Sequence, residues 1–278
     1  MSTCDHNCDT CAQNCGERAA IQKKPLRAGA RVRHVYAVVS GKGGVGKSMV
    51  TAQLAVSMRR RGYSAAILDA DITGPSIPKM FGLHEMALSA DGAILPVRSR
   101  TGIQIMSINL LLEHETDPVV WRGPVIAGAV HQFWTDVLWQ DVDYLFVDMP
   151  PGTGDVALSV FQGLPVDGII LVTSPQELVG MVVEKAVKMA QMMRLDVVGL
   201  VENMSYLACP DCGKRIYLFG EGKTEDAAAR YGLPLLAKMP LEPVLTKQAD
   251  AGDIESFCGD WLDGAAETLL HRGEATRD

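Results

Sequence analysis

Residues 41–48 read Gly-Lys-Gly-Gly-Val-Gly-Lys-Ser, and this segment is the most informative part of the chain. It fits the pattern Gly-x-x-x-x-Gly-Lys-[Ser/Thr] in full. The apolar run Val35–Val39 precedes it and the helical pattern Ser48–Arg60 follows it. Glycines let the backbone wrap tightly around phosphate groups and point its N–H groups inward. A glycine-rich turn without chemical purpose is the alternative, but motif and context together favour a loop that binds nucleotide phosphates.

Two side chains of this loop have expected roles in holding a nucleotide. Lys47 would contact the β- and γ-phosphates, and Ser48 would ligate Mg²⁺. The residues expected to contact ATP along this stretch are Gly41, Lys42, Gly43, Gly44, Val45, Gly46, Lys47, Ser48 and Met49.

Strand-like and helical patterns alternate along the rest of the chain. The apolar runs are short and nearly continuous in hydrophobicity, as expected for strands that are buried on both faces. This alternation predicts an α/β fold, with a mostly parallel central sheet and helices on both of its faces. The expected strands are His34–Val39, Ala65–Leu68, Ile103–Ile108, Tyr144–Val147, Gly168–Val172, Val197–Val201 and Leu235–Met239. The clearest helical patterns are Ser48–Arg60, Val125–Trp139 and Glu177–Met193.

Cysteine usage divides the 278-residue chain into two parts. Residues 1–15 hold four of the seven cysteines, and residues 16–31 are polar and basic without a strong period. We expect residues 1–31 to form a cysteine-rich segment and a linker. Residues 32–278 would then form one nucleotide-binding domain, because a second full domain would be cramped in this length.

The composition of the chain argues against two classes of partner. With 26 basic and 33 acidic residues, the net charge is −7, so the chain lacks the basic footprint of a nucleic-acid-binding protein. No apolar stretch approaches the roughly 18 residues of a membrane span, and the N-terminus has no charged-then-apolar signal pattern. We therefore expect a cytoplasmic protein with no nucleic-acid or membrane partner. Thiols stay reduced in that compartment, so the cysteines suggest metal or redox chemistry.

Carboxylates follow two of the expected strands. Asp69 and Asp71 close one strand, and Asp148 closes another, at the end where parallel sheets bind ligands. Asp148 would support Mg²⁺ through water, Asp71 would orient or deprotonate the attacking water, and Asp69 would help to hold the metal–water network. Asp155 is a further candidate. Because Asp is common at strand ends and turns, these assignments depend on the phosphate loop beside them.

Lys42, near the start of the loop, is not required by the general motif and indicates a subclass of these proteins. Lys-Gly-Gly-Val-Gly-Lys-Ser (42–48) resembles the deviant Walker A motif of the ATPases that include nitrogenase iron protein, MinD and ParA. This resemblance implies that Lys42 reaches across a homodimer to the nucleotide of the partner and acts there much as an arginine finger does. The alternative for Lys42 is a solvated surface lysine.

Three further segments resemble one branch of these ATPases. Asp-Ala-Asp-Ile-Thr-Gly-Pro-Ser-Ile-Pro (69–78) and Asp-Met-Pro-Pro-Gly-Thr-Gly-Asp (148–155) are similar to the switch segments of Mrp-type, or ApbC-like, iron–sulfur cluster carriers. Val-Glu-Asn-Met-Ser-Tyr (201–206) also matches, and the resemblance covers about residues 32–255. It implies that Asn203 recognises the adenine edge, for which an amide offers both a donor and an acceptor. The alternative for Asn203 is a cap at the end of a strand.

Cys209 and Cys212 form a Cys-x-x-Cys pair. One such pair is half of a tetrahedral ligand set, and a symmetric dimer would supply the other half. Gly213 and the β-like run Arg215–Phe219 follow the pair, as is typical of a metal knuckle, whereas a redox dithiol normally begins a helix. From the residues alone zinc, an iron–sulfur cluster, a redox dithiol and a plain turn remain open. The resemblance implies a [4Fe-4S] cluster that bridges two chains.

The N-terminal cysteines are Cys4, Cys8, Cys11 and Cys15. Four thiolates in so short a segment could complete one metal site without help. Their spacing departs both from the wider spacing of some relatives and from the tighter ferredoxin pattern. A four-iron cluster, zinc and a flexible thiol tail that hands clusters over all remain open.

Together these residues and the resemblance to the cluster carriers predict a homodimeric ATPase that uses ATP and Mg²⁺ to gate the carriage of a [4Fe-4S] cluster to apo-proteins. The first alternative is a MinD- or ParA-like positioning ATPase, which would need a basic amphipathic C-terminal helix or a basic face. The C-terminal stretch 260–268 is acidic instead. The second alternative keeps the ATPase and replaces the cluster with structural zinc.

Overall fold

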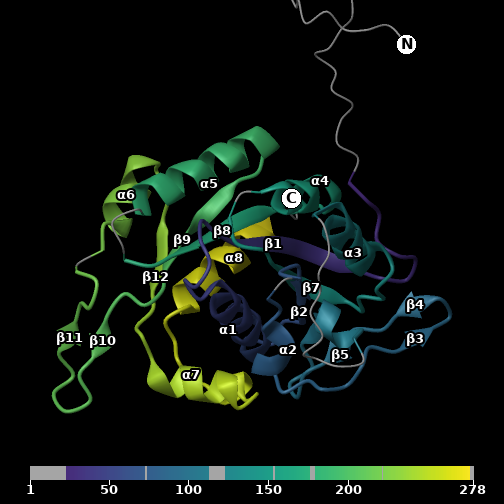
Figure 1. Ribbon diagram of the computed structural model, residues 1–278, viewed down its shortest axis with the longest axis horizontal. Coiled ribbons are helices and arrows are strands. Elements are labelled where there is room, and N and C mark those ends of the chain that lie inside the picture. Colours follow the sequence, from purple (N-terminus) through teal and green to yellow (C-terminus); the bar gives the residue numbers. More distant parts are fainter. Residues whose placement is uncertain are drawn as a thin grey trace, which may run out of the picture.

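The computed structural model describes residues 23–72, 74–112, 123–152, 154–175, 179–220 and 222–275 (Figure 1). The four N-terminal cysteines therefore lie outside the described residues. Residues 23–31, expected to belong to the linker, contact the domain: the backbone N–H of Lys24 donates to the carbonyl of Gly163, and that of Arg31 donates to Trp139.

An eight-stranded sheet forms the centre of the molecule. Its strand order is β12-β9-β8-β1-β7-β2-β6-β5, and every pair is parallel except β5 with β6. The predicted parallel sheet is confirmed. The strands are β1 (Val32–Ser40), β2 (Ala65–Asp69), β5 (Val97–Arg98), β6 (Gln104–Met106), β7 (Val142–Asp148), β8 (Gly168–Thr173), β9 (Val197–Glu202) and β12 (Leu235–Lys238).

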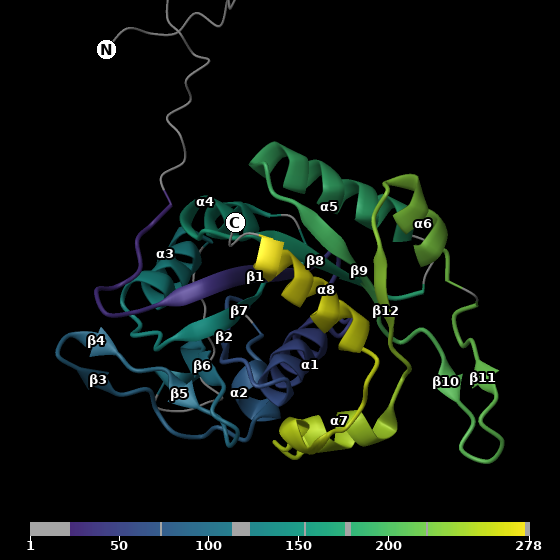
Figure 2. The same ribbon diagram turned by 180° about the vertical axis from the view of Figure 1, so that it is seen from behind.

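Helices cover both faces of the sheet, as Figure 2 shows. Alternate residues of β1 face two separate cores: Val35 and Val39 belong to one core, and Tyr36 and Val38 belong to the other. The first core is closed by α3 (Gly123–Thr135), α4 (Asp155–Gly163), α5 (Val179–Met193) and α6 (Thr224–Arg230). The second is closed by α1 (Lys47–Arg60), α2 (Ile77–Met80), α7 (Pro243–Asp250) and α8 (Asp263–Ala275).

The remaining elements are short. Two antiparallel pairs, β3 (Ser89–Ala90) with β4 (Ala93–Ile94) and β10 (Leu207–Ala208) with β11 (Arg215–Ile216), stand apart from the main sheet. Two 3₁₀ turns, Ile108–Leu110 and Ile254–Ser256, complete the structure. Among the described helices none is long and apolar enough to cross a bilayer.

One predicted helix boundary is wrong. The pattern Val125–Trp139 extends past Thr135, where α3 ends. Val137 forms a bridge with Ile94, and the N–H of Leu138 donates to the Ile94 carbonyl. Pairing with a neighbouring segment therefore takes the backbone groups that further helix would have used.

The parallel arrangement decides where the chemistry lies. Asp69 at the end of β2 stands beside Asp148 at the end of β7 in the sheet register, and Asp148 stands beside Val38 near the end of β1. The carboxyl ends of these strands therefore meet at one edge of the sheet. The loop that leaves β1 and the segment that leaves β9 begin at the same edge.

Candidate nucleotide site and cysteine hairpin

The loop between β1 and α1 requires glycine at two positions. Gly44 and Gly46 both have φ of 79°, a left-handed conformation that glycine adopts without a Cβ penalty. A Cβ on Gly46 would also lie 2.1 Å from Nδ2 of Asn203. The sequence thus builds a tight loop whose underside is filled by a side chain from the end of β9.

Lys47 lies at the centre of a buried ion-pair network. Its Nζ lies 2.8 Å from Oδ1 of Asp148 and 3.6 Å from Oδ2 of Asp71. Asp148 is fully buried, and it also accepts hydrogen bonds from Ser48 Oγ (2.5 Å) and Thr51 Oγ1 (2.8 Å). The structure therefore brings together the predicted lysine, the predicted hydroxyl and two of the predicted carboxylates.

Asp69 lies beneath this network, 1% exposed. It accepts hydrogen bonds from Ser107 Oγ (3.0 Å) and from the backbone N–H of Asp71 (3.2 Å). Burial, and then the charge of Asp148, raise the pKa of Asp69 to about 8, against the opposing effect of Lys47. Burial therefore favours the neutral form of the Asp69 carboxyl.

A cleft of about 300 Å³ opens above the loop. Ser48 and Asp71, whose side chains carry hydroxyl and carboxylate oxygens, line it together with Lys47. Oxygen ligands of this kind suit Mg²⁺, which is held by one or two protein groups and by the phosphates of a nucleotide, so these residues fit that ion. The lining residues are Ser40, Gly43, Gly44, Gly46, Lys47, Ser48, Met49, Asp71, Gly74, Ser76, Met80 and Pro151.

Lys42 and Gly41 lie on the other side of the loop. Both line a small hollow that is shared with Ser174 and Val182, not the cleft in front of Lys47. A Cβ on Gly41 would lie 2.2 Å from Cγ1 of Val182, so this position also excludes a side chain. Lys42 is half-buried, and its backbone carbonyl accepts a hydrogen bond from Ser40 Oγ (3.0 Å).

Asn203 holds the loop from below. Its side chain is 6% exposed, and Nδ2 donates to the carbonyl of Val45 at 3.0 Å. Its backbone N–H donates to Thr173 at the end of β8. The amide nitrogen is thus bonded to the loop, and recognition of adenine by Asn203 stays a prediction.

The cysteine pair lies on the β10–β11 hairpin, which follows directly from the segment that contains Asn203. The N–H of Cys209 donates to the carbonyl of Lys214, and the N–H of Gly213 donates back to Cys209, which closes a tight turn. Cys209 is half-buried and Cys212 is exposed, both as free thiols. The backbone N–H groups of Cys212 and Asp211 lower the pKa of the Cys209 thiol, because they stabilise its thiolate.

Among the described residues the cysteine pair has no third candidate metal ligand beside it. Within the described ranges no three His, Cys, Asp or Glu side chains come together as a metal site. A tetrahedral site on this hairpin would therefore need two ligands from another chain or from residues outside the described ranges.

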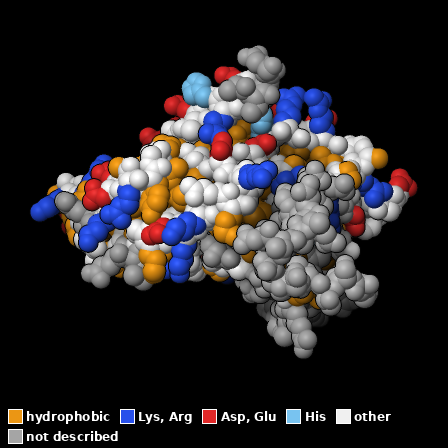
Figure 3. Space-filling view, turned by 90° about the horizontal axis from the view of Figure 1, so that it is seen from above, with side chains coloured by type: hydrophobic (Ala, Val, Ile, Leu, Met, Phe, Trp, Pro, Cys, Tyr) orange, Lys and Arg blue, Asp and Glu red, His pale blue; other side chains and the backbone are white. Residues whose placement is uncertain are grey.

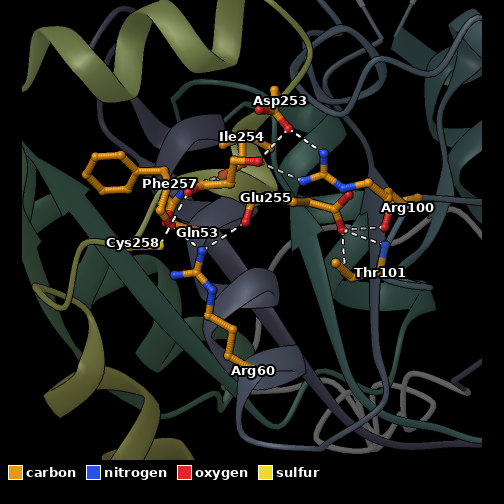
Figure 4. Close-up of polar contacts among 11 residues, drawn as sticks. Gln53, Arg60, Arg100, Thr101, Asp253, Ile254, Glu255, Phe257 and Cys258 are labelled. Carbon is orange, nitrogen blue, oxygen red and sulfur yellow. Dashed lines mark hydrogen bonds and ion pairs between the residues drawn. The ribbon is translucent and has the colours of Figure 1, made fainter.

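Polar contacts fasten α1 to the C-terminal part of the chain (Figure 4). Arg60 of α1 donates to the carbonyls of Glu255 (2.9 Å) and Phe257. The Glu255 carboxylate is buried and accepts a hydrogen bond from the backbone N–H of Thr101 at 3.2 Å, and Arg100 pairs with Asp253 at 2.7 Å. The Arg60 contacts hold α1, the helix that begins with Lys47 and Ser48, and the other two join residues 100–101 to the same C-terminal segment.

The sequence did not single out Thr51 or Ser107. Thr51 lies one helical turn beyond Lys47 and Ser48 on the same face, so helical spacing was the signal that could have found it. Ser107 follows the β6 strand, as the carboxylates follow theirs. Asp155 begins α4.

Comparison with known proteins places the chain in a family. The model of the family described as ParA: NUBPL iron-transfer P-loop NTPase matches residues 31–263. The chain belongs to this family. The iron–sulfur cluster carrier proteins of Clostridium perfringens and Methanocaldococcus jannaschii are each 40% identical to it, over 90% and 91% of this chain and 92% and 90% of the relatives. The resemblance drawn from the sequence is confirmed.

Solved structures agree with this assignment. The nucleotide-binding protein from Archaeoglobus fulgidus, in complex with ADP, is 44% identical to this NUBPL-type chain, with a TM-score of 0.76 over 84% of this chain and 91% of that one. MinD of Pyrococcus horikoshii, complexed with Mg-ADP, is 19% identical with a TM-score of 0.58 over 88% of this chain and 98% of that one, and this likeness shows the shared fold.

Proposed function

We propose that this NUBPL-type chain binds and hydrolyses ATP and uses the nucleotide state to control how it holds a [4Fe-4S] cluster for delivery to apo-proteins. One observation carries the proposal: the buried Lys47–Asp148 site and the Cys209–Cys212 hairpin are joined by one short segment. Asn203 in that segment is bonded to the phosphate loop, and the cysteines follow it. The names of the relatives support the nature of the cargo.

ATP would bind in the cleft above the loop. Lys47 would leave Asp148 for the β- and γ-phosphates, and the loop N–H groups would take the remaining phosphate oxygens. Mg²⁺, held by Ser48 and through water by Asp148, would neutralise charge on those phosphates. Asp71 would orient the attacking water, whose oxygen bonds to the γ-phosphorus as the bond to the bridging oxygen of ADP breaks.

A homodimer would complete both sites. Lys42 lines a different hollow from the cleft of its own chain, which suits a contact with the nucleotide of a partner. Each chain offers two thiolates, so two chains would offer the four that a [4Fe-4S] cluster takes. The cluster is cargo in this proposal, and its loss to an apo-protein is the transfer step.

The test is anaerobic purification and reconstitution with iron and sulfide, followed by iron, sulfide and zinc analysis. It compares the intact chain with Cys209→Ala/Cys212→Ala and with Cys258→Ala, which removes an exposed thiol elsewhere. We expect the double variant, and not Cys258→Ala, to lose part or all of its iron and acid-labile sulfide. Any iron that remains in the double variant would be assigned to the N-terminal cysteines. Zinc without iron in the intact chain would favour the structural-zinc alternative, and no metal at all would leave only the ATPase.

A further inference from the structure

Thr51 lies beneath the nucleotide site, and no step of the proposed function uses it. It belongs to α1, one helical turn after Lys47, and its side chain is 0% exposed. Its hydroxyl donates to Oδ1 of Asp148 at 2.8 Å, and the backbone carbonyl of Lys47 lies 3.0 Å from the same hydroxyl. A side chain buried to this extent does not reach a nucleotide in the cleft. Any role that Thr51 has in the site must therefore act through Asp148.

The Thr51 hydroxyl has one proton and two acceptors within reach. A threonine inside a helix can bond to the carbonyl four residues earlier, which is that of Lys47 here. The carboxylate of Asp148 is the stronger acceptor, because a hydrogen bond to an ionised group is about twice as strong as one between neutral groups. The proton is therefore directed to Asp148, and the bond ties the first turns of α1 to the end of β7.

Asp148 depends on such donors because of where it lies. On the face seen in Figure 3, acidic side chains lie at the surface among basic ones, where water can hydrate them. Asp148 is fully buried, so protein groups must supply its hydrogen bonds. Among the described residues three side chains do so: Lys47 and Thr51 contact Oδ1, and Ser48 contacts Oδ2.

The proposed function takes two of these three donors away from Asp148. When nucleotide and Mg²⁺ bind, Lys47 turns to the phosphates and Ser48 turns to the ion. Thr51 is buried below both of them and stays where it is. Its bond then keeps Oδ1 of Asp148 occupied and leaves Oδ2, the oxygen beside Ser48, to serve the ion.

We propose that Thr51 is a positioning residue of the magnesium site, whose hydroxyl holds the Asp148 carboxylate in place once Lys47 and Ser48 have turned to the nucleotide and the ion. This inference rests on the nucleotide-binding part of the proposed function. Loss of the hydroxyl costs little while Asp148 keeps its two other donors, and more when both have left. Affinity follows the difference between the two states, so the loss weakens binding of the ion.

Four substitutions in the full chain test this role. Thr51→Val and Thr51→Ala both remove the hydroxyl, the first with the shape of the side chain kept, whereas Thr51→Ser retains it. The matched control is Thr224→Val, because Thr224 is also fully buried in a helix and its hydroxyl has no hydrogen-bond partner. Urea unfolding identifies the variants that fold, and either hydroxyl-free variant is sufficient for the comparison.

Isothermal titration calorimetry measures binding of AMP-PNP, an ATP analogue with N–H in place of the β–γ bridging oxygen, in EDTA and over a series of Mg²⁺ concentrations. We expect the hydroxyl-free variants to weaken Mg²⁺ binding to the complex of protein and AMP-PNP by about tenfold or more, the factor that one hydrogen bond to a charged group supplies. Affinity for AMP-PNP in EDTA should change far less, because Ser48 stays with Asp148 when no ion is present. Thr51→Ser and Thr224→Val should match the intact chain.

Unchanged Mg²⁺ affinity in the hydroxyl-free variants would overturn the inference. An equal loss of nucleotide affinity with and without Mg²⁺ would also overturn it, because the substitution would then disturb the phosphate loop as a whole. So would a Thr51→Ser variant that behaves like Thr51→Val. Failure of the proposed function is distinguishable: the Thr51 effect in a chain that holds no cluster supports the inference without the carrier function, whereas nucleotide binding that ignores Mg²⁺ in the intact chain overturns both.

Discussion

Replacing Gly46 with alanine tests how the phosphate loop is held. The new Cβ would stand 2.1 Å from Nδ2 of Asn203, so the buried Asn203 side chain must leave its place and its hydrogen bond to the Val45 carbonyl. Gly44 provides a matched control. It has the same φ of 79°, but a Cβ there would meet nothing within 4 Å.

The expected magnitudes follow from these contacts. Alanine in a left-handed conformation costs about 1–2 kcal/mol, and both variants bear that cost. Displacing Asn203 also leaves buried polar groups without partners, which costs about 1–3 kcal/mol more. Gly46→Ala should therefore lower the free energy of unfolding by about 2–5 kcal/mol, and Gly44→Ala by about 1–2 kcal/mol.

Urea unfolding of the nucleotide-free protein measures both values. Trp134 and Trp139 are buried in the core, so tryptophan fluorescence reports the transition. A double-mutant cycle repeats both substitutions in an Asn203→Ala background. There the extra loss of stability at Gly46 should disappear, because the side chain that the new Cβ would displace is absent.

Two results would refute this reasoning. Equal losses for the two glycine variants would show that Asn203 does not fill the underside of the loop. An excess loss at Gly46 that persists in the Asn203→Ala background would assign the cost to some other contact.

Three further predictions concern charge. Lys47→Met leaves the fully buried Asp148 without its cation, so unfolding in urea should show a loss of about 3–5 kcal/mol, and a loss below about 1 kcal/mol would contradict the ion pair. Because the pKa of Asp69 is raised from 3.8 in the unfolded chain to about 8 in the folded protein, its contribution to stability is fully present below pH 3.8 and is lost as the pH rises to about 8. Asp69→Asn should therefore make the free energy of unfolding fall less steeply between these two pH values. An unchanged slope would contradict the raised pKa. The lowered pKa of Cys209 means that iodoacetamide should alkylate this thiol in the metal-free chain at a pH below the ordinary range for cysteine. Mass spectrometry of its peptide that finds alkylation only within the ordinary range would contradict the prediction.

The sequence was sufficient for the sheet and for the charged centre of the site. Its motif fixed which strand carries the loop, and parallel strands bring their carboxyl ends together, so Asp71 and Asp148 had to lie near Lys47. Thr51 and Ser107 could not be chosen in the same way. Hydroxyl residues are frequent, and only the observed distances to Asp148 and Asp69 separate these two from the rest.

Tertiary contacts explain the other differences between the predicted and the observed secondary-structure elements. The helical pattern before Trp139 was apolar enough to continue, but pairing of Val137 with Ile94 ended the helix earlier. The run Arg215–Phe219 suggested a strand, yet β11 holds only Arg215 and Ile216. A sequence gives the apolar character of such a run, whereas its exposure depends on whether any other element packs against it.

The segment after β9 explains why the nucleotide and the cysteines should affect each other. Asn203 is bonded to the loop, Met204 has φ of 57°, and the N–H of Ser205 donates to Met239 in the second core. A non-glycine residue held in a left-handed conformation indicates that its surroundings fix it there. The hairpin with Cys209 therefore begins from a segment that is bonded both to the loop and to the second core. The proposed function therefore predicts that a nucleotide at the loop changes the affinity of the hairpin for metal, and linkage requires that metal at the hairpin change nucleotide affinity by the same factor.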